Sequence, residues 1–405
     1  MKSIVTLAYF FFCIVVFRQT SSNTKEPCTD AIAQTTKGKW IKRYDNASNI
    51  TPAQKQEAYK RLDIVHNTLL KMYPDPTGVD VRESRGAGIA YFGSTRKYRY
   101  TEDGELAFDY VKLLPIKAYS YYANFSPHFC AHTDKGIIFQ PGVMNENSDG
   151  PRVAINDFAG LAGSPASDDD WTLNGLPVNT LATKTSENWK GYEVYGDIRD
   201  RVRTILLHRE GMLPYIPVTR KQYLERCIAV TTKLHNNIID FQKQMPVRSP
   251  EEEEAEKKAK LEKFEKDFGK DPKRLKSAVD YYLSGYKSDQ QIRDEEVEKA
   301  IKIRDAELKK FNDELEKSTK EGLLDSPAFI RVRYNPDMIF DTNHQTGSML
   351  VTDNPDYIRK DLPAHVPQFI VFTWKWHDDY PPHAKYKRLL LEEFPIEKLQ
   401  AMIDK

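Results

Sequence analysis

The sequence is poor in cysteine, with four in 405 residues, and this scarcity limits how the chain can be held together. Cys13 lies in the apolar N-terminal run, so removal of that run leaves Cys28, Cys130 and Cys227. Three cysteines cannot form the disulfide framework of a small secreted scaffold. We expect buried free thiols; an oxidising compartment would permit one disulfide with one cysteine left over, in a pairing that the sequence leaves open.

The chain also lacks an excess of charge of either sign. Lys and Arg number 60 against 59 Asp and Glu, so the net charge is close to zero. No basic surface for phosphates is indicated, and we predict no nucleic-acid partner. The hydrophobic content of 40% and the charged content of 29% are those of a globular protein rather than a disordered one.

Long apolar runs are absent except at the N-terminus. Lys2 precedes an almost unbroken apolar stretch at 4–17, and small polar residues follow at 20–22. This order is typical of a secretory signal peptide, which we predict over residues 1–22. The stretch is shorter than the ~20 residues that span a bilayer, and a short membrane anchor is the alternative. We therefore expect an exported protein, periplasmic, on the cell surface or secreted, with no transmembrane helix in the mature chain.

Familiar catalytic motifs are missing as well. The sequence contains no G-x-S-x-G element, no P-loop and no H-E-x-x-H motif. Gly86, Gly88 and Gly93 lie close together, but no helix is predicted after them, and the dinucleotide-binding fingerprint needs one. The commonest hydrolase and nucleotide signatures are thus excluded. We predict no cofactor, with zinc or iron as the alternative considered below.

Hydrophobic periodicity divides the rest of the chain into three parts. In residues 23–217, a helix at 51–73 begins with a capping box, and strands of period two follow from 88 to 208. Residues 218–325 are helical, and 326–405 combine strands and helices. We predict an α+β fold in which a mainly antiparallel sheet carries a long helical, coiled-coil-like hairpin insertion at 218–325. The segment 326–405 would complete the β-rich body; two independent β domains are the alternative.

The first long helix of the insertion has apolar residues at spacings of three and four. We expect one buried stripe, made of Tyr223, Cys227, Val230, Leu234, Ile238, Phe241 and Met245.

The stretch WKWHDDYPPH, residues 374–383, is the strongest candidate for a metal site. In an extended strand, alternation puts Ile370, Phe372, Trp374 and Trp376 on one face, and His377 and Asp379 on the other. His383 could fold back as a third ligand, and two histidines with one carboxylate form a recognised zinc or iron set. The competing interpretation, which we favour, is the end of a strand entering solvent before a proline-started helix.

Three weaker sites follow from local patterns. His128 and His132 flank Cys130 on one side of a strand and are zinc ligand types. Tyr119 and Tyr121 share a strand face that could bind sugar or peptide. Residues 145–150 (NENSDG) resemble the start of a calcium loop, but the pattern fails where a bidentate Glu is needed, and a turn is the better interpretation.

Two segments carry a resemblance to a known group of proteins. Residues 209–224 (REGMLPYIPVTRKQYL) and 349–374 (MLVTDNPDYIRKDLPAHVPQFIVFTW), with GKWIKR at 38–43, resemble uncharacterised exported proteins of Gram-negative bacteria. The resemblance implies a periplasmic or surface location and carries no assigned activity, so it identifies no functional residue.

These observations lead to two functional hypotheses. The first is a non-catalytic exported envelope or binding protein whose charged helical insertion presents a surface to a protein or glycan partner. The second is a secreted hydrolase, with or without a metal ion, that uses His377, Asp379 and His383.

Overall fold

The computed structural model describes residues 28–89, 92, 94–100, 106–112, 114–133, 136–141, 149–163, 172–173, 175–196, 201–330, 339–341 and 347–405. The predicted signal peptide at 1–22 lies outside these residues. The fold is α+β with a large, mainly antiparallel sheet, as the sequence predicts. Within the described part of the chain, no helix is both long and apolar enough to cross a membrane.

The main sheet combines strands from both ends of the chain. Its order is β1 (Trp40–Ala47), β2 (Val79–Ile89), β5 (Ala118–Thr133), β7 (Gly150–Ile155), β17 (Ile370–Lys375), β13 (Val202–Leu207), β12 (Tyr192–Tyr195) and β11 (Lys184–Trp189), with β6 (Gly136–Pro141) on β5. All pairs are antiparallel except β1 with β2, which is parallel. Because β17 lies between β7 and β13, the C-terminal segment contributes an interior strand to this sheet.

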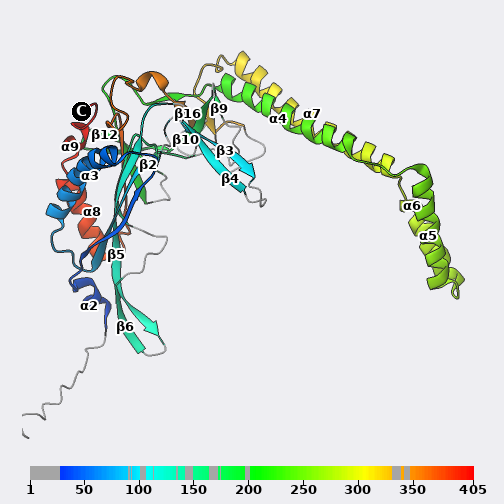
Figure 1. The fold of residues 1–405 in the computed structure, drawn as a ribbon, viewed down its shortest axis with the longest axis horizontal. Helices are drawn as coiled ribbons and strands as arrows, with labels where there is room; N and C mark the ends of the chain where they lie inside the picture. The colour runs from blue at the N-terminus through cyan, green and yellow to red at the C-terminus, as the bar shows by residue number, and fades with distance from the viewer. Residues whose placement is uncertain are drawn as a thin grey trace, which may run out of the picture.

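Helices cover one face of this sheet, as Figure 1 shows at the left. They are α3 (Pro52–Met72), α8 (Pro381–Glu393) and α9 (Ile396–Gln400). The predicted capping box of α3 is present, with Thr51 accepting from the backbone of Gln54. Leu62 and Leu69 of α3 join Phe372 of β17 in one buried cluster. Each such side chain contributes about 1.5–3 kcal/mol by leaving water, so this layer holds the helices against the sheet.

A second sheet packs on the other face. It contains β14 (Tyr215–Pro217), β16 (Ser348–Asp353), β10 (Leu176–Leu181), β8 (Ala162–Gly163), β9 (Thr172–Leu173) and β15 (Phe329–Ile330), and a separate pair joins β3 (Ser94–Tyr100) to β4 (Leu106–Lys112). Phe369 and Val371 pack there with Val351 of β16. Strand β17 and the residue before it are therefore buried on both faces, which explains this continuous run of apolar residues.

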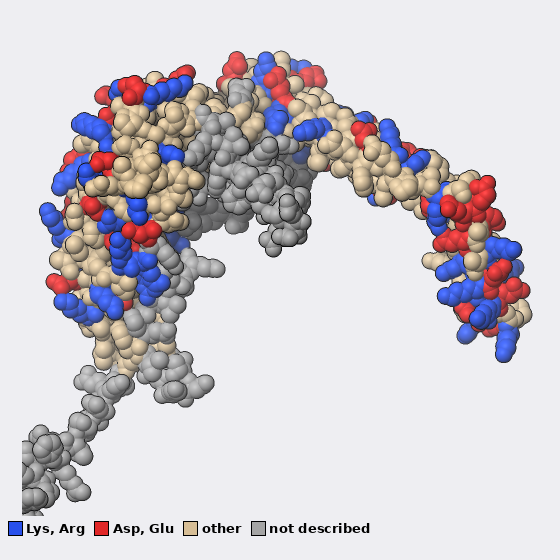
Figure 2. All heavy atoms as spheres, in the orientation of Figure 1, with Lys and Arg blue, Asp and Glu red and all other residues tan. Residues whose placement is uncertain are grey.

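Four helices leave the body between β14 and β15 and form an arm: α4 (Arg220–Gln244), α5 (Pro250–Phe268), α6 (Pro272–Gly285) and α7 (Asp289–Lys320). Figure 1 shows α4 and α7 extending side by side, with α5 and α6 at the far end. The pair runs antiparallel: His235 Nε2 lies 2.9 Å from Glu307 Oε2, and Arg293 reaches the carbonyl of Met245. Figure 2 shows mixed Lys, Arg, Asp and Glu at the far end of the arm and fewer charged side chains on the visible face of its middle.

The predicted apolar stripe of α4 is wrong over its distal half. The side chains buried along the helix are three and then four residues apart: Leu224, Cys227, Thr231, His235 and Ile239. In contrast, Leu234, Ile238, Phe241 and Met245 are exposed, Phe241 at 63%. A spacing of four turns the contact gradually around the helix, because four residues exceed one turn of 3.6. The contact with α7 therefore leaves the distal half of the expected stripe in solvent.

One disulfide links the N-terminal segment to the main sheet. Cys28 is bonded to Cys130 of β5, and Cys227 is a buried free thiol. Our expectation of three free thiols is therefore wrong. The bonded residues are 102 positions apart, and only the folded sheet brings them within bonding distance.

Candidate metal centre

Strand pairing brings Asp149 next to His377. In the ladder between β7 and β17, Gly150 is opposite Lys375, so the residues just beyond this pair leave the sheet edge together. Gly150 has a φ of +128°, and a Cβ on it would lie 2.1 Å from the carbonyl oxygen of Ala123. Only glycine fits this close approach, which places Asp149 beside the end of β17.

The first turn of α8 supplies the third member of the cluster. Tyr380 precedes α8, Pro381 starts it, and His383 follows in the first turn. The ring of His383 packs against those of Tyr380 and Trp376, with centroids 4.9 and 5.8 Å away. These contacts hold the imidazole over the sheet edge, where it meets Asp149.

Asp149 contacts both histidines through separate oxygens. His377 Nδ1 lies 2.5 Å from Asp149 Oδ1, and His383 Nδ1 lies 2.7 Å from Oδ2. The backbone N–H of His377 also donates to Oδ2. These three side chains offer ligand atoms that all lie within 4.8 Å of one another. Two imidazoles and a carboxylate are the donor set of catalytic zinc and non-haem iron sites.

Burial and charge act on Asp149 in opposite directions. The residue is fully buried, and burial raises the pKa of its carboxyl. The interactions with His383 and with the backbone and ring of His377 lower it by more, so the pKa stays below its usual value. His383 is also buried, whereas the side chain of His377 is 31% exposed. The cluster thus holds an ionised carboxylate with one side open to solvent.

The structure separates Asp379 from the predicted ligand set. Its side chain is 83% exposed and pairs with Arg201, with 2.9 Å between Nη2 and Oδ2. The prediction assumed that the strand continues through Asp379, but β17 ends at Lys375. His377 and His383 do converge, around Asp149 rather than Asp379. The favoured interpretation describes the course of the chain, because β17 ends at Lys375, Asp379 is exposed and α8 starts at Pro381, but it did not anticipate that His383 is buried.

The second predicted histidine site loses its sulfur ligand. Cys130 is bonded to Cys28, and His128 is buried with its Nε2 3.2 Å from Asp80 Oδ1. His132 is paired with Ile137 in the β5–β6 ladder, and its side chain lies outside the described residues. His128 is therefore held by a buried hydrogen bond to Asp80 within the body.

The predicted aromatic binding surface is part of the core. Tyr119 and Tyr121 are buried beneath α3, and Tyr121 donates a hydrogen bond to Glu83. The shared face was predicted correctly, but that face is covered by a helix layer. A glycan cannot stack on these two rings in the folded protein.

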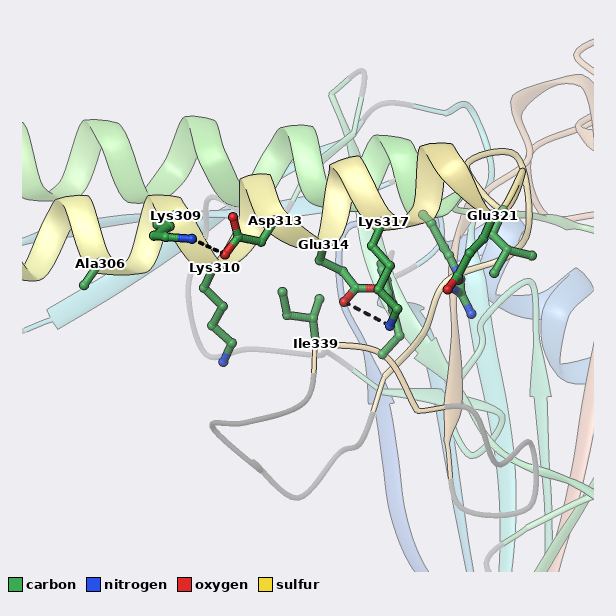
Figure 3. Close-up of a pocket in the computed structure, with 11 residues that line it drawn as sticks. Ala306, Lys309, Lys310, Asp313, Glu314, Lys317, Glu321 and Ile339 are labelled. Carbon is green, nitrogen blue, oxygen red and sulfur yellow. Dashed lines mark hydrogen bonds and ion pairs between the residues drawn. The ribbon is translucent and has the colours of Figure 1, made fainter.

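A groove of about 690 Å³ lies at the base of the arm, between α7 and the segment that includes Ile339. Figure 3 shows Lys309 paired with Asp313, and Glu314 paired with Lys317, along its wall. Both signs of charge alternate there, so the groove favours neither an anion nor a cation. The groove is therefore a weaker candidate for a functional site than the Asp149 cluster.

Asp149 is the residue that the sequence reasoning missed. It was noted only as part of the calcium-like turn at 145–150, of which residues 145–148 lie outside the described residues. The sequence feature that could have identified Asp149 is its position directly before a strand, β7, that could pair with β17. Comparison with protein-family models, with curated proteins and with solved structures found no match to this chain.

Proposed function

We propose that this is a non-catalytic exported protein that binds its partner through the helical arm. The Cys28–Cys130 disulfide supports export, because such bonds form and persist in oxidising compartments. We also propose that α4 to α7 act as the coiled-coil-like hairpin inserted into the α+β body. Because Tyr119 and Tyr121 are buried, a protein partner is better supported than a glycan.

The observation that carries this proposal is an apolar strip on α4 that nothing in the described chain covers. We define the α4 strip as Leu234, Ile238, Phe241 and Met245, all of them exposed. Successive members of the strip are four, three and four residues apart, so they lie on one side of the helix over about 16 Å. Helix faces of this kind are the usual docking elements of helical partners.

The charges around the strip favour a second copy of this chain as its occupant. Between residues 234 and 245 the only Asp, Glu, Lys or Arg residues are Asp240 and Lys243, whereas α5 is dense in both signs. Two α4 helices related by a two-fold axis would therefore meet without strong like-charge repulsion. Such isologous pairing is the commonest form of homo-oligomer. In the antiparallel arrangement, Leu234 of one copy faces Met245 of the other.

Light scattering coupled to size exclusion tests this proposal on the mature chain. We expect a dimer that Phe241→Glu converts to a monomer, because a charge is then buried in the apolar strip. Tyr281→Glu is the matched control, since Tyr281 is an aromatic residue of α6 with 83% exposure. A wild-type chain that stays monomeric at all concentrations, or an unchanged dimer for Phe241→Glu, would refute it.

A second candidate function, a secreted metal-dependent hydrolase, is favoured by the Asp149 cluster. Three protein ligands leave a coordination position for water, as catalytic zinc requires. The test is turnover by metal-loaded protein on ester, phosphate and peptide substrates. Hydrolysis lost in His377→Ala and kept in Asp379→Ala would favour this function over the non-catalytic one.

A further inference from the structure

We infer that Asp149, His377 and His383 bind one divalent transition-metal ion of the zinc class. This inference is independent of the proposed arm interface, which lies on other helices. It also differs from the set expected from sequence, since the carboxylate comes from the β7 edge and not from Asp379.

The hydrogen bond on the far side of His383 carries the argument. Nε2 of this buried ring lies 3.0 Å from the carbonyl oxygen of Phe125. A carbonyl only accepts, so Nε2 must carry the hydrogen. In the neutral ring Nδ1 is then unprotonated, and its lone pair faces Oδ2 of Asp149 at 2.7 Å. Two lone pairs repel at this distance unless a cation lies between them.

The contacts of His383 match those of a metal ligand. Nδ1 is buried and has no hydrogen-bond partner, although it is close to Asp149. Histidines that bind metals commonly donate their other ring N–H to a backbone carbonyl, which fixes the tautomer and the ring orientation. Phe125 supplies that carbonyl from the centre of β5. The bond therefore presents Nδ1 to the cluster with its lone pair available.

The donor set determines the class of ion. Two imidazole nitrogens and one carboxylate oxygen suit zinc, iron and neighbouring metals, whereas calcium and magnesium prefer oxygen ligands throughout. Zinc ligands in a tetrahedral site are ~3.3 Å apart, given bond lengths of ~2.0–2.1 Å. The separations between the histidine Nδ1 atoms and the Asp149 oxygens are 2.5 and 2.7 Å, so they need to widen only slightly to accept the ion. Rotation of the partly exposed ring of His377 can widen the first of these separations.

The competing arrangement has a proton in place of the metal. His383 would then be a buried imidazolium paired with Asp149, and the cluster would be purely structural. Nitrogen NMR of the histidine rings in the full chain separates the two. A doubly protonated His383 at neutral pH that does not change on addition of Zn²⁺ would overturn the inference.

Metal loading gives the direct test. The mature chain is stripped with chelator, incubated with Zn²⁺, passed through gel filtration and analysed for bound metal. We expect about one equivalent, a raised melting temperature, and visible absorption bands when Co²⁺ replaces Zn²⁺. Less than about a tenth of an equivalent would overturn the inference.

Variants assign the bound ion to this cluster. His377→Ala should weaken Zn²⁺ binding by more than about tenfold, and its partial exposure makes it the variant best tolerated by the fold. Asp379→Ala is the control, because Asp379 is two residues away but pairs with Arg201 in solvent. Equal zinc binding by His377→Ala and the wild type would overturn the assignment.

Discussion

His377 and Asp149 are 228 residues apart in the chain, yet their side chains meet at 2.5 Å. The antiparallel pairing of β7 and β17 produces this contact, because it aligns the start of one strand with the end of the other. Gly150, the residue next to Asp149, lies where the chain passes close to β5. The geometry of the cluster is thus a consequence of sheet register.

Gly150→Ala should disrupt the cluster through the backbone. Its new methyl group would lie 2.1 Å from the carbonyl oxygen of Ala123, so β5 and β7 must move apart. Gly191→Ala is the matched control: its φ is +92°, but no atom lies within 4 Å of the added Cβ. We expect about 1–2 kcal/mol of destabilisation for the control and at least about 2 kcal/mol more for Gly150→Ala in urea titrations. Equal losses would show that the close approach is unimportant.

Asp157 should make stability depend on pH between about 4 and 6. Burial raises the pKa of this carboxyl to about 6, although the N–H of Ala159 and the charge of Arg152 lower it. The folded pKa exceeds the unfolded one, so its stabilising contribution is complete below the unfolded value and is lost as pH rises through 6.

Asp157→Asn removes this dependence while keeping an oxygen for the N–H of Ala159. We expect the variant to be more stable than the wild type at pH 8 by as much as about 3 kcal/mol, from about two units of pKa shift. Near pH 4 the two proteins should be alike. Denaturant titrations across this range check the result, and a constant difference at all pH values would contradict it.

Counting thiols tests export and disulfide formation together. In denaturant without reductant, the mature chain should show one thiol, Cys227, because Cys28 and Cys130 are bonded. Two thiols would indicate that Cys13 is retained, and three would exclude the disulfide. The Cys28→Ser, Cys130→Ser double variant should lose about 2–5 kcal/mol of unfolding free energy, while Cys227→Ala should lose less.

Local features of the fold could be predicted because they depend on neighbouring residues. The capping boxes of α3 and α4 use a side chain and a backbone group three positions apart. Pro250 and Pro381 start helices because a proline at the first position sacrifices no hydrogen bond. The face of β17 that includes Phe372 and Trp374 followed from strand alternation, and it is buried as expected.

The errors arose wherever a partner distant in sequence decides the outcome. Alternation could not show that β17 ends at Lys375, so Asp379 was wrongly placed beside His377. The apolar spacing of α4 could not show which side α7 covers, so Phe241 was expected to be buried. Tyr121 was correctly placed on a strand face, but the helix above that face is a tertiary contact.

By itself, the sequence determined the capped helix that begins after Thr51, the helical character of 218–325, the strand that includes Trp374, and two of the three residues in the cluster. Hydrogen bonds and side-chain periodicity over a few residues are sufficient for these. The tertiary structure alone decided that Asp149 joins the two histidines, that Cys28 meets Cys130, and that the α4 strip faces solvent. Each of these depends on strand register or helix packing between distant segments, whose energies no local pattern of residues contains.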